Sequence, residues 1–220
     1  MNLKAFLAEF IATFALIFIG VGSIAVDHIT NGGTGLLGIA LAHGLTLCVM
    51  ISATAAISGG HVNPAVTIGL FCAKKIDLKN TIGYVIFQCL GAIVAAWTLK
   101  LALPSSALIA VKMGTPSLGE GVTVGMGLLI EAILTFFLVF AVYGTAVDKR
   151  APQMGGLFIG LTVAFDILVG GPLTGAAMNP ARYIGPALLS GDLSNAWLYW
   201  VGPIVGGVFA AVVYKSCLEK

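Results

Sequence analysis

Long apolar segments alternate with short polar loops along most of the chain. A helix needs about 20 predominantly apolar residues to cross the roughly 30 Å hydrocarbon core of a bilayer. Six segments reach or approach this length and contain almost no charged side chains. The pattern predicts an all-α membrane protein whose six transmembrane helices span Ala5–Val26, Gly35–Ser58, Thr81–Leu99, Gly121–Val147, Gly155–Gly171 and Ala196–Tyr214. Because the fifth segment is the shortest, we expect its helix to extend a few residues at either end.

Two more apolar segments, Pro64–Ala73 and Pro180–Gly191, are too short to cross a membrane. Ten residues of helix are about 15 Å long, which is half of the hydrocarbon thickness. Pro64–Ala73 also lacks the basic face of a helix that lies on the membrane surface. We therefore expect two re-entrant half-helices that enter from opposite sides and meet near the midplane. Unwound backbone survives at that depth only where protein or a water-filled cavity surrounds it.

The two halves of the chain resemble each other. The stretch AEFIATF at 8–14 is similar to IEAILTF at 130–136, and HVNPA at 61–65 is similar to AMNPA at 177–181. Each half holds three spans, and this odd number inverts the second half relative to the first. The pattern predicts a single transmembrane domain built from inverted repeats at approximately 1–103 and 118–220. Functional sites of such repeats lie near the midplane, often at broken helices.

Composition and charge agree with a membrane protein. Hydrophobic residues make up 59% of the 220-residue chain and charged residues 9%, with a mean hydropathy of +1.04, whereas soluble domains carry about 25% charged residues. The net charge of +2 is too small to attract nucleic acid. The four cysteines lie far apart without a histidine at ligand spacing, so we expect no metal and no cofactor. These features exclude a disordered chain, a nucleic-acid-binding protein and an ordinary soluble enzyme.

The loops differ in their content of lysine and arginine, which indicates an orientation. If the N-terminus is inside, eight basic residues fall on the cytoplasmic side and two fall outside. We therefore expect both termini to be cytoplasmic, in the cell (inner) membrane. The inner set is Lys4, Lys74, Lys75, Lys79, Lys149, Arg150, Lys215 and Lys220, and the outer set is Lys100 and Lys112.

Each predicted half-helix begins with an Asn-Pro-Ala motif. Asparagine is a strong N-cap, and proline is favoured at the first helical position because it lacks an N–H there. We expect each Asn carbonyl to bind its own helix, which leaves the amide N–H groups free as donors. With the partial positive charge of each helix N-terminus, two such ends would orient passing water, interrupt a proton wire and repel cations. The motifs consist of Asn63, Pro64, Ala65 and of Asn179, Pro180, Ala181.

The sequences HVNPAVT, MNPARYIGP, AEFIATF and IEAILTF resemble the aquaporin (major intrinsic protein) family. The resemblance covers essentially the whole chain. It implies a right-handed bundle of six tilted helices plus two half-helices, with one pore per subunit. It also implies a homotetramer in the lipid bilayer that passes water and small neutral solutes. The short termini and compact loops are typical of a bacterial or archaeal member.

Arg182 is the only charged residue in either half-helix, three residues after Asn179. An ionisable residue within a membrane is a candidate for a functional role, although an arginine can also extend its side chain to the interface. In the family, the Arg of this motif lines the outer constriction. The resemblance implies that the family's other constriction positions, carried over by their distance from the motifs, are His43, Ile167 and Ala176. The set resembles the plant tonoplast subgroup more than strict water channels, and for His43 a role in helix packing is the alternative.

Ile167 occupies a position where water-selective members usually have His, so this filter offers one donor fewer. We expect permeability to ammonia, and also to hydrogen peroxide or urea, alongside water. Tyr183, which stands where glycerol-conducting members typically have Asp, argues against glycerol, as do the adjacent Tyr199 and Trp200. An ammonia- or glycerol-type facilitator with water as a side activity stays an alternative. So does a secondary transporter, since inverted repeats and broken helices are found there too.

The remaining polar residues inside the spans receive structural predictions. Glu9 and Glu131 occupy equivalent places, and we expect each carboxylate to brace a re-entrant loop whose backbone N–H groups need acceptors; a proton-relay or coupling-ion role is the alternative. His61 is expected to line the cytoplasmic half of the pore, where it would brace the loop or gate with pH. Asp166 is expected to take a hydrogen-bonded packing role, for example at a subunit contact, and a filter role is the alternative. No nucleophile, base and orienting group converge in the motifs, so we expect no enzymatic activity.

Overall fold

The computed structural model describes residues 2–152 and 154–219, and within these ranges the regular secondary structure is entirely helical. Six of its helices are long and apolar enough to cross a membrane. They confirm the six predicted spans, with boundaries that differ by a few residues. These helices are α1 (Leu3–Ile29), α2 (Gly35–Ser58), α4 (Leu78–Ala102), α6 (Val124–Val142), α7 (Gly155–Thr174) and α9 (Ala196–Val213).

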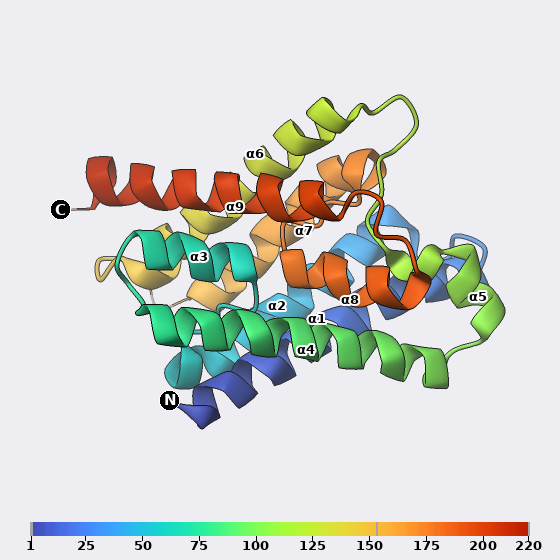
Figure 1. Ribbon diagram of the computed structural model, residues 1–220, viewed down its shortest axis with the longest axis horizontal. Coiled ribbons are helices and arrows are strands. Elements are labelled where there is room, and N and C mark those ends of the chain that lie inside the picture. The colour runs from blue at the N-terminus through green and yellow to red at the C-terminus, as the bar shows by residue number, and fades with distance from the viewer. Residues whose placement is uncertain (1, 153, 220) are drawn as a thin grey trace.

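The two short helices begin at the Asn-Pro-Ala motifs. They are α3 (Pro64–Cys72) and α8 (Pro180–Ser190), which confirms both predicted half-helices. Each packs against the last long helix of the opposite half, α3 against α9 and α8 against α4. Figure 1 shows α3 and α8 in opposite halves of the molecule, with α3 in the half where both termini lie.

Two π-helical turns extend the spans at the end that carries the termini. The π-helical segments η2 (Tyr143–Val147) and η3 (Tyr214–Leu218) continue α6 and α9 directly. The rings of Tyr143 and Tyr214 lie 5.3 Å apart, so the two extensions pack on each other. This contact joins the end of the fourth span to the C-terminal segment.

The connection between the halves contains structure that the sequence analysis missed. No helix was predicted there, yet it folds into α5 (Ser105–Ala110) and a 3₁₀ turn, η1 (Lys112–Gly114). Leu108 and Met113 are only 2% and 4% exposed, and both belong to the main buried apolar cluster. Their burial against the spans orders this segment, a tertiary effect that six residues of helical propensity cannot supply.

Helices α2 and α7 cross at two glycines. A Cβ atom added to Gly44 would lie 2.6 Å from the backbone oxygen of Gly160, and one added to Gly160 would overlap Gly44 in the same way. The small-residue pair Gly202 and Gly206 likewise faces the backbone of α6. Small residues let helix backbones approach closely in membranes, so the four spans involved form a tight frame for the centre of the bundle.

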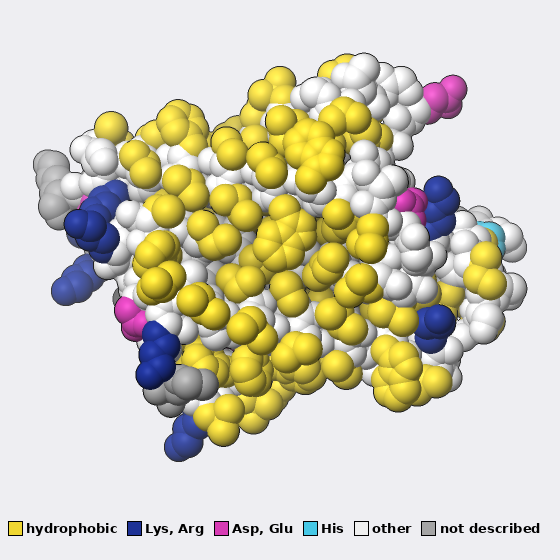
Figure 2. All heavy atoms as spheres, in the orientation of Figure 1, with side chains coloured by type: hydrophobic (Ala, Val, Ile, Leu, Met, Phe, Trp, Pro, Cys, Tyr) yellow, Lys and Arg dark blue, Asp and Glu magenta, His cyan; other side chains and the backbone are white. Residues whose placement is uncertain are grey.

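Apolar side chains cover most of the outer surface. Figure 2 shows them across the middle of one face, with charged groups gathered at the two ends and basic groups concentrated at the end that carries the termini. Exposed large apolar residues occur on every long helix, among them Leu7, Val49, Ile82, Leu129, Val169 and Phe209. An apolar belt between charged ends is the surface of an integral membrane protein.

Candidate functional site

The N-termini of α3 and α8 face each other at the centre of the bundle, and each is capped by an asparagine. The side-chain oxygen of Asn63 accepts from the Ala65 N–H at 2.8 Å. That of Asn179 accepts from the N–H groups of Ala181 at 3.0 Å and Arg182 at 3.2 Å. Each motif proline occupies the start of its helix. The local capping therefore follows the pattern predicted from the sequence.

The two asparagines also link the halves. The Asn63 amide donates to the carbonyl of Met178, and the Asn179 amide donates to the carbonyl of Val62, both at 2.9 Å. Val62 and Met178 adopt left-handed backbone conformations, with φ of 55° and 51°, which are unusual for residues other than glycine. This backbone strain turns both carbonyls toward the opposite asparagine. Each amide keeps one N–H, not two, so the expectation that both stay free is corrected.

The carboxylate of Glu9 lies beside the loop that precedes α3. It accepts hydrogen bonds from the Ser58 hydroxyl at 2.6 Å, the His61 N–H at 2.9 Å and the Val62 N–H at 2.6 Å. The Gln88 amide of α4 donates to it as well, at 2.7 Å. Glu9 is fully buried. The four donors stabilise its carboxylate, and the carboxylate in turn gives the backbone N–H groups of the loop an acceptor.

Glu131 makes matching contacts with the loop that precedes α8. Its oxygens accept from the Thr174 hydroxyl at 2.7 Å, the Ala177 N–H at 2.9 Å and the Met178 N–H at 2.7 Å. Two tyrosines complete the match, because the Tyr84 hydroxyl donates to the Ser58 carbonyl and that of Tyr199 to the Thr174 carbonyl. Apart from the additional Gln88 donor at Glu9, both halves thus hold their re-entrant loops with equivalent groups.

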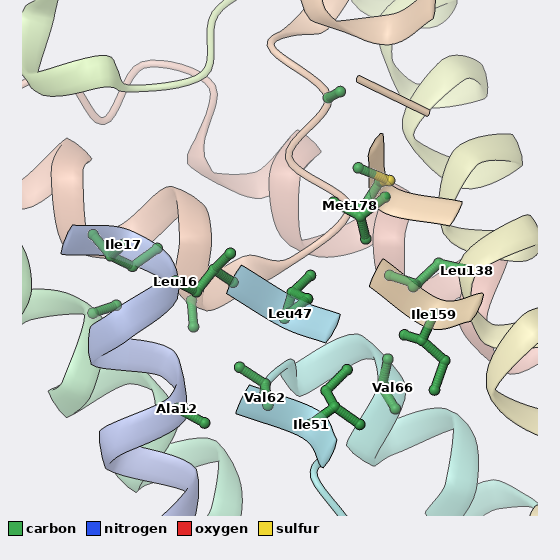
Figure 3. Close-up of a cluster of buried hydrophobic side chains, with 14 of the residues drawn as sticks. Ala12, Leu16, Ile17, Leu47, Ile51, Val62, Val66, Leu138, Ile159 and Met178 are labelled. Atoms are coloured by element: carbon green, nitrogen blue, oxygen red, sulfur yellow. The ribbon is translucent and has the colours of Figure 1, made fainter. Parts of the chain in front are cut away.

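A narrow cavity runs between the half-helices. The space open to the centre of a water molecule totals only about 30 Å³ inside it, enough for roughly two or three waters. Figure 3 shows apolar side chains from several helices pointing toward this space. Its described lining includes Leu16, Leu47, Ile51, Val62, Val66, Leu138, Ile159, Met178 and both capping asparagines.

A wider cavity, the outer vestibule, adjoins the narrow one at the end away from the termini. It offers about 300 Å³ on the same measure. His43, Ile167 and Arg182 line both spaces and therefore lie at the junction between them. Ala176 lines the narrow cavity alone. The structure thus brings the four predicted filter residues together around one passage.

Arg182 is buried, with 4% of its surface exposed. Its Nη1 donates to the backbone oxygen of Gly114 at 2.9 Å, so the connection between the halves holds the guanidinium in place. The alternative in which this side chain extends to the membrane interface is excluded by that burial. The sequence analysis missed Gly114, and a backbone acceptor leaves no signal in side-chain chemistry.

His43 packs and lines the passage at the same time. Its Nδ1 lies 2.9 Å from the Ile39 carbonyl; since a carbonyl only accepts, Nδ1 carries a proton. The ring lies against Gly20, where an added Cβ would overlap it. The two alternatives considered for this histidine, packing and pore lining, are therefore compatible.

A third cavity, the inner mouth, adjoins the narrow one at the end with the termini. It offers about 260 Å³, and His61 lines both spaces. The His61 ring sits edge-on to Tyr84, and its Nδ1 lies 3.1 Å from the Thr67 hydroxyl. His61 therefore lies where the sequence predicted, next to the loop and on the passage.

A model of the family described as major intrinsic protein matches residues 1–214. The chain belongs to this family. It is 47% identical to aquaporin TIP4-4 of Zea mays over 97% of this chain and 86% of that protein, and 44% identical to aquaporin TIP2-3 of Arabidopsis thaliana over the same shares. An aquaglyceroporin structure from Plasmodium falciparum superposes with a TM-score of 0.87 at 28% identity, over 99% of this chain and 97% of that one. These likenesses confirm the resemblance seen in the motifs, while the bacterial or archaeal source stays a prediction.

Asp166 departs from the expectation for this major intrinsic protein. It is 1% exposed, and its Oδ2 atom has no hydrogen-bond partner among the described residues. The predicted hydrogen-bonded role is therefore wrong for that oxygen, and its burial within one subunit removes it from a subunit contact. The sequence could not show which groups surround this side chain.

Gln88 is a site residue that the sequence analysis missed. It is fully buried in α4, and its amide donates to Glu9 and to the Thr67 hydroxyl. A signal was available, because Gln88 is the lone strongly polar residue at the centre of an apolar span. The reasoning that singled out Glu9 and Glu131 applies equally to it.

Proposed function

We propose that this major intrinsic protein is a passive channel for water and small neutral solutes that excludes protons and ions. The observation that carries the proposal is that three cavities adjoin one another along the bundle. The narrow cavity shares lining residues with the outer vestibule on one side and with the inner mouth on the other. A narrow cavity with a wider cavity adjoining it at each end suits diffusion of small molecules one behind another.

Proton and cation exclusion is supported by the centre of the passage. Asn63 and Asn179 each keep one amide N–H after the bond that links the halves. A water that accepts from both must donate outward in both directions, which interrupts a proton wire. The helix N-termini behind the asparagines and the buried guanidinium of Arg182 add positive potential against cations.

The loop contacts favour a channel over a secondary transporter. Transport by alternating access needs coupling groups that are free to bind an ion near the midplane. Glu9 and Glu131 are instead saturated by donors from the re-entrant loops, which supports their role as braces. The matched bonds also support the inverted repeats at 1–103 and 118–220.

Permeability to ammonia, hydrogen peroxide or urea is the finer part of the proposal. Ile167 is 5% exposed and lies at the junction of vestibule and narrow cavity, where its side chain offers no donor. Similarity to TIP-type aquaporins supports a filter of that subgroup. An ammonia facilitator with water as a side activity is the second candidate, favoured by the same apolar wall.

For the assembly and its setting, we propose a homotetramer in the cell (inner) membrane with both termini cytoplasmic. The excess of basic residues at the end that carries the termini supports this orientation. Exposed Cys217 offers a test. In intact expressing cells of a Cys72→Ser variant, a membrane-impermeant maleimide should label a cysteine placed at Ser194 but should reach Cys217 only after lysis.

The test of function is stopped-flow light scattering on proteoliposomes that shrink under a sucrose gradient, with protein-free vesicles as reference. We expect fast shrinkage with the low activation energy of a water pore. Shrinkage no faster than that of bare lipid would contradict water conduction. Ammonia uptake in the same vesicles would then decide whether the second candidate takes its place.

A further inference from the structure

The two halves correspond residue by residue from the second long helix of each half to its half-helix. Asn63 and Asn179 are 116 positions apart, and so are Ser58 and Thr174, whose hydroxyls bind the two glutamates equivalently. The same shift carries each filter residue onto a partner in the other half. His43 corresponds to Ile159, Ile167 to Ile51, Ala176 to Gly60 and Arg182 to Val66.

The four partners gather at the inner end of the passage. All of them line the narrow cavity, and Gly60, Val66 and Ile159 also line the inner mouth. This repeats the position of the outer filter, where His43, Ile167 and Arg182 line two cavities. We call the partner set Ile51, Gly60, Val66 and Ile159 the inner ring.

We propose that the inner ring is a second, apolar constriction that limits the rate of water passage, while the outer filter selects the solute. The proposal rests on the channel function given above. It assigns a permeability-determining role to aliphatic residues outside the filter and the asparagine motifs.

An independent pair of positions supports the correspondence. Glu9 and Glu131 set a shift of 122 for the first helix of each half, which relates Gly20 to Val142. At the outer end, Gly20 leaves the space that the His43 ring fills. At the inner end, where the partner of His43 is the smaller Ile159, Val142 lines both the narrow cavity and the inner mouth. Compared with the outer end, the inner end therefore has a larger side chain at the first-helix position, Val142, and a smaller one at Ile159, and both are apolar.

The two constrictions differ in what they offer to water. Arg182 supplies guanidinium donors at the outer filter, whereas Val66, its partner, offers none. Among the described side chains that line both the narrow cavity and the inner mouth, His61 is the only polar one, and its Nδ1 is engaged with Thr67. Water that enters the ring loses hydrogen bonds to the wall on most sides, and apolar constrictions resist wetting for that reason.

The test adds a hydroxyl to the ring and compares each threonine with an aliphatic residue of the same size. Val66→Thr keeps the shape of the side chain, and Ile159→Thr is compared with the equally sized Ile159→Val. We expect each threonine variant to raise water permeability per channel about two- to tenfold over its aliphatic reference, the range that one net hydrogen bond represents. The ratio of ammonia to urea permeability, which the intact outer filter sets, should not change.

Either of two results would overturn the proposal. Equal water permeability in both threonine variants and their references would mean that the ring does not limit flow. A changed ammonia-to-urea ratio would mean that the ring selects solutes. The water flux of the wild type tests the channel function separately. If the wild type conducted no water and Val66→Thr did, the ring would be closing the pore. If neither conducted water, the proposal would fail together with water conduction.

Discussion

At the scale of single residues, the side chain of Ile167 has the most direct consequence for solute choice. Replacing it with histidine restores a donor and narrows the junction between the outer vestibule and the narrow cavity. We expect Ile167→His to reduce ammonia flux severalfold relative to water flux, as measured by vesicle alkalinisation and light scattering on the same proteoliposomes. Ile167→Val, which changes size without adding a donor, is the matched control. Equal ammonia flux in Ile167→His and wild type would show that this wall does not set the preference.

The Glu9 carboxylate gives a prediction for stability. An amide at this position keeps one acceptor oxygen but turns an N–H pair toward groups that themselves donate, the Val62 N–H and the Gln88 amide. Since a hydrogen bond to a buried charge contributes about 1.5–3 kcal/mol, Glu9→Gln should lower the melting temperature in detergent and reduce water flux. Glu120→Gln, at an exposed site in the connection between the halves, should do neither. Equal melting temperatures of Glu9→Gln and the wild type would refute the bracing role of Glu9.

Much of the residue-scale chemistry could be predicted from the sequence. The capping of Asn63 and Asn179 depends on the residues next to them in the chain, so local preference was sufficient. The bond from each amide to the opposite loop joins residues more than a hundred positions apart, and nothing local encodes it. Gln88 could have been recognised, because a buried polar side chain in a span needs partners.

At the scale of elements, the crossing of α2 and α7 is the contact most sensitive to volume. Gly44→Ala places a methyl group 2.6 Å from the Gly160 carbonyl oxygen and 2.7 Å from the Ala164 Cβ. Because the backbones of the two helices are in direct contact there, the added methyl group must push the helices apart. We expect a clear drop in melting temperature and in water flux.

The control for this crossing is Gly125→Ala, in the first turn of α6. An added Cβ meets nothing within 4 Å at that position, and alanine is a better helix former than glycine by about 1 kcal/mol. Gly125→Ala should therefore leave the protein as stable as the wild type or slightly more so. If Gly44→Ala behaved like Gly125→Ala, the tight crossing would not hold the bundle.

The positions of the long helices and the half-helices could be predicted from the lengths of the apolar segments, whereas that of α5 could not. All six spans and both half-helices were predicted because twenty or ten apolar residues have few alternatives in a bilayer. The short α5 was not predicted, since its six residues are ordered only by burying Leu108 against the spans.

At the scale of the whole molecule, a cluster of polar contacts ties the C-terminal segment to the loop after α6. Arg150 is paired with Asp148 and donates to the Leu218 carbonyl at 3.0 Å, while the Tyr214 hydroxyl donates to Asp148. Hydrogen bonds from the Arg150 side chain and its backbone N–H hold the pKa of Asp148 well below its ordinary value of 3.8. A lowered carboxyl pKa stabilises the folded arrangement fully above that ordinary value, and the contribution is lost as the pH falls through the lowered pKa.

Hydrogen–deuterium exchange over residues 214–219 measures this cluster. Protection in the wild type should persist from neutral pH down to the ordinary carboxyl range and disappear only in stronger acid. Asp148→Asn should exchange faster already at neutral pH, because Arg150 loses its ionic partner. Asp192→Asn, at the opposite end of the molecule, is the control and should match the wild type. Protection that ends near neutral pH in the wild type would contradict the assignment to Asp148.

The sequence by itself determined the class of this protein, its spans and its half-helices. Those features depend on apolar length and on caps, which act within a few turns of one helix. Tertiary structure decided how Asn63 and Asn179 bind across the halves, how Gly114 holds Arg182, and that one oxygen of Asp166 has no partner among the described residues. It also brought Val66 and Ile159 together at the inner end of the passage. Contacts between distant segments depend on how the helices pack, and packing is a property of the whole bundle.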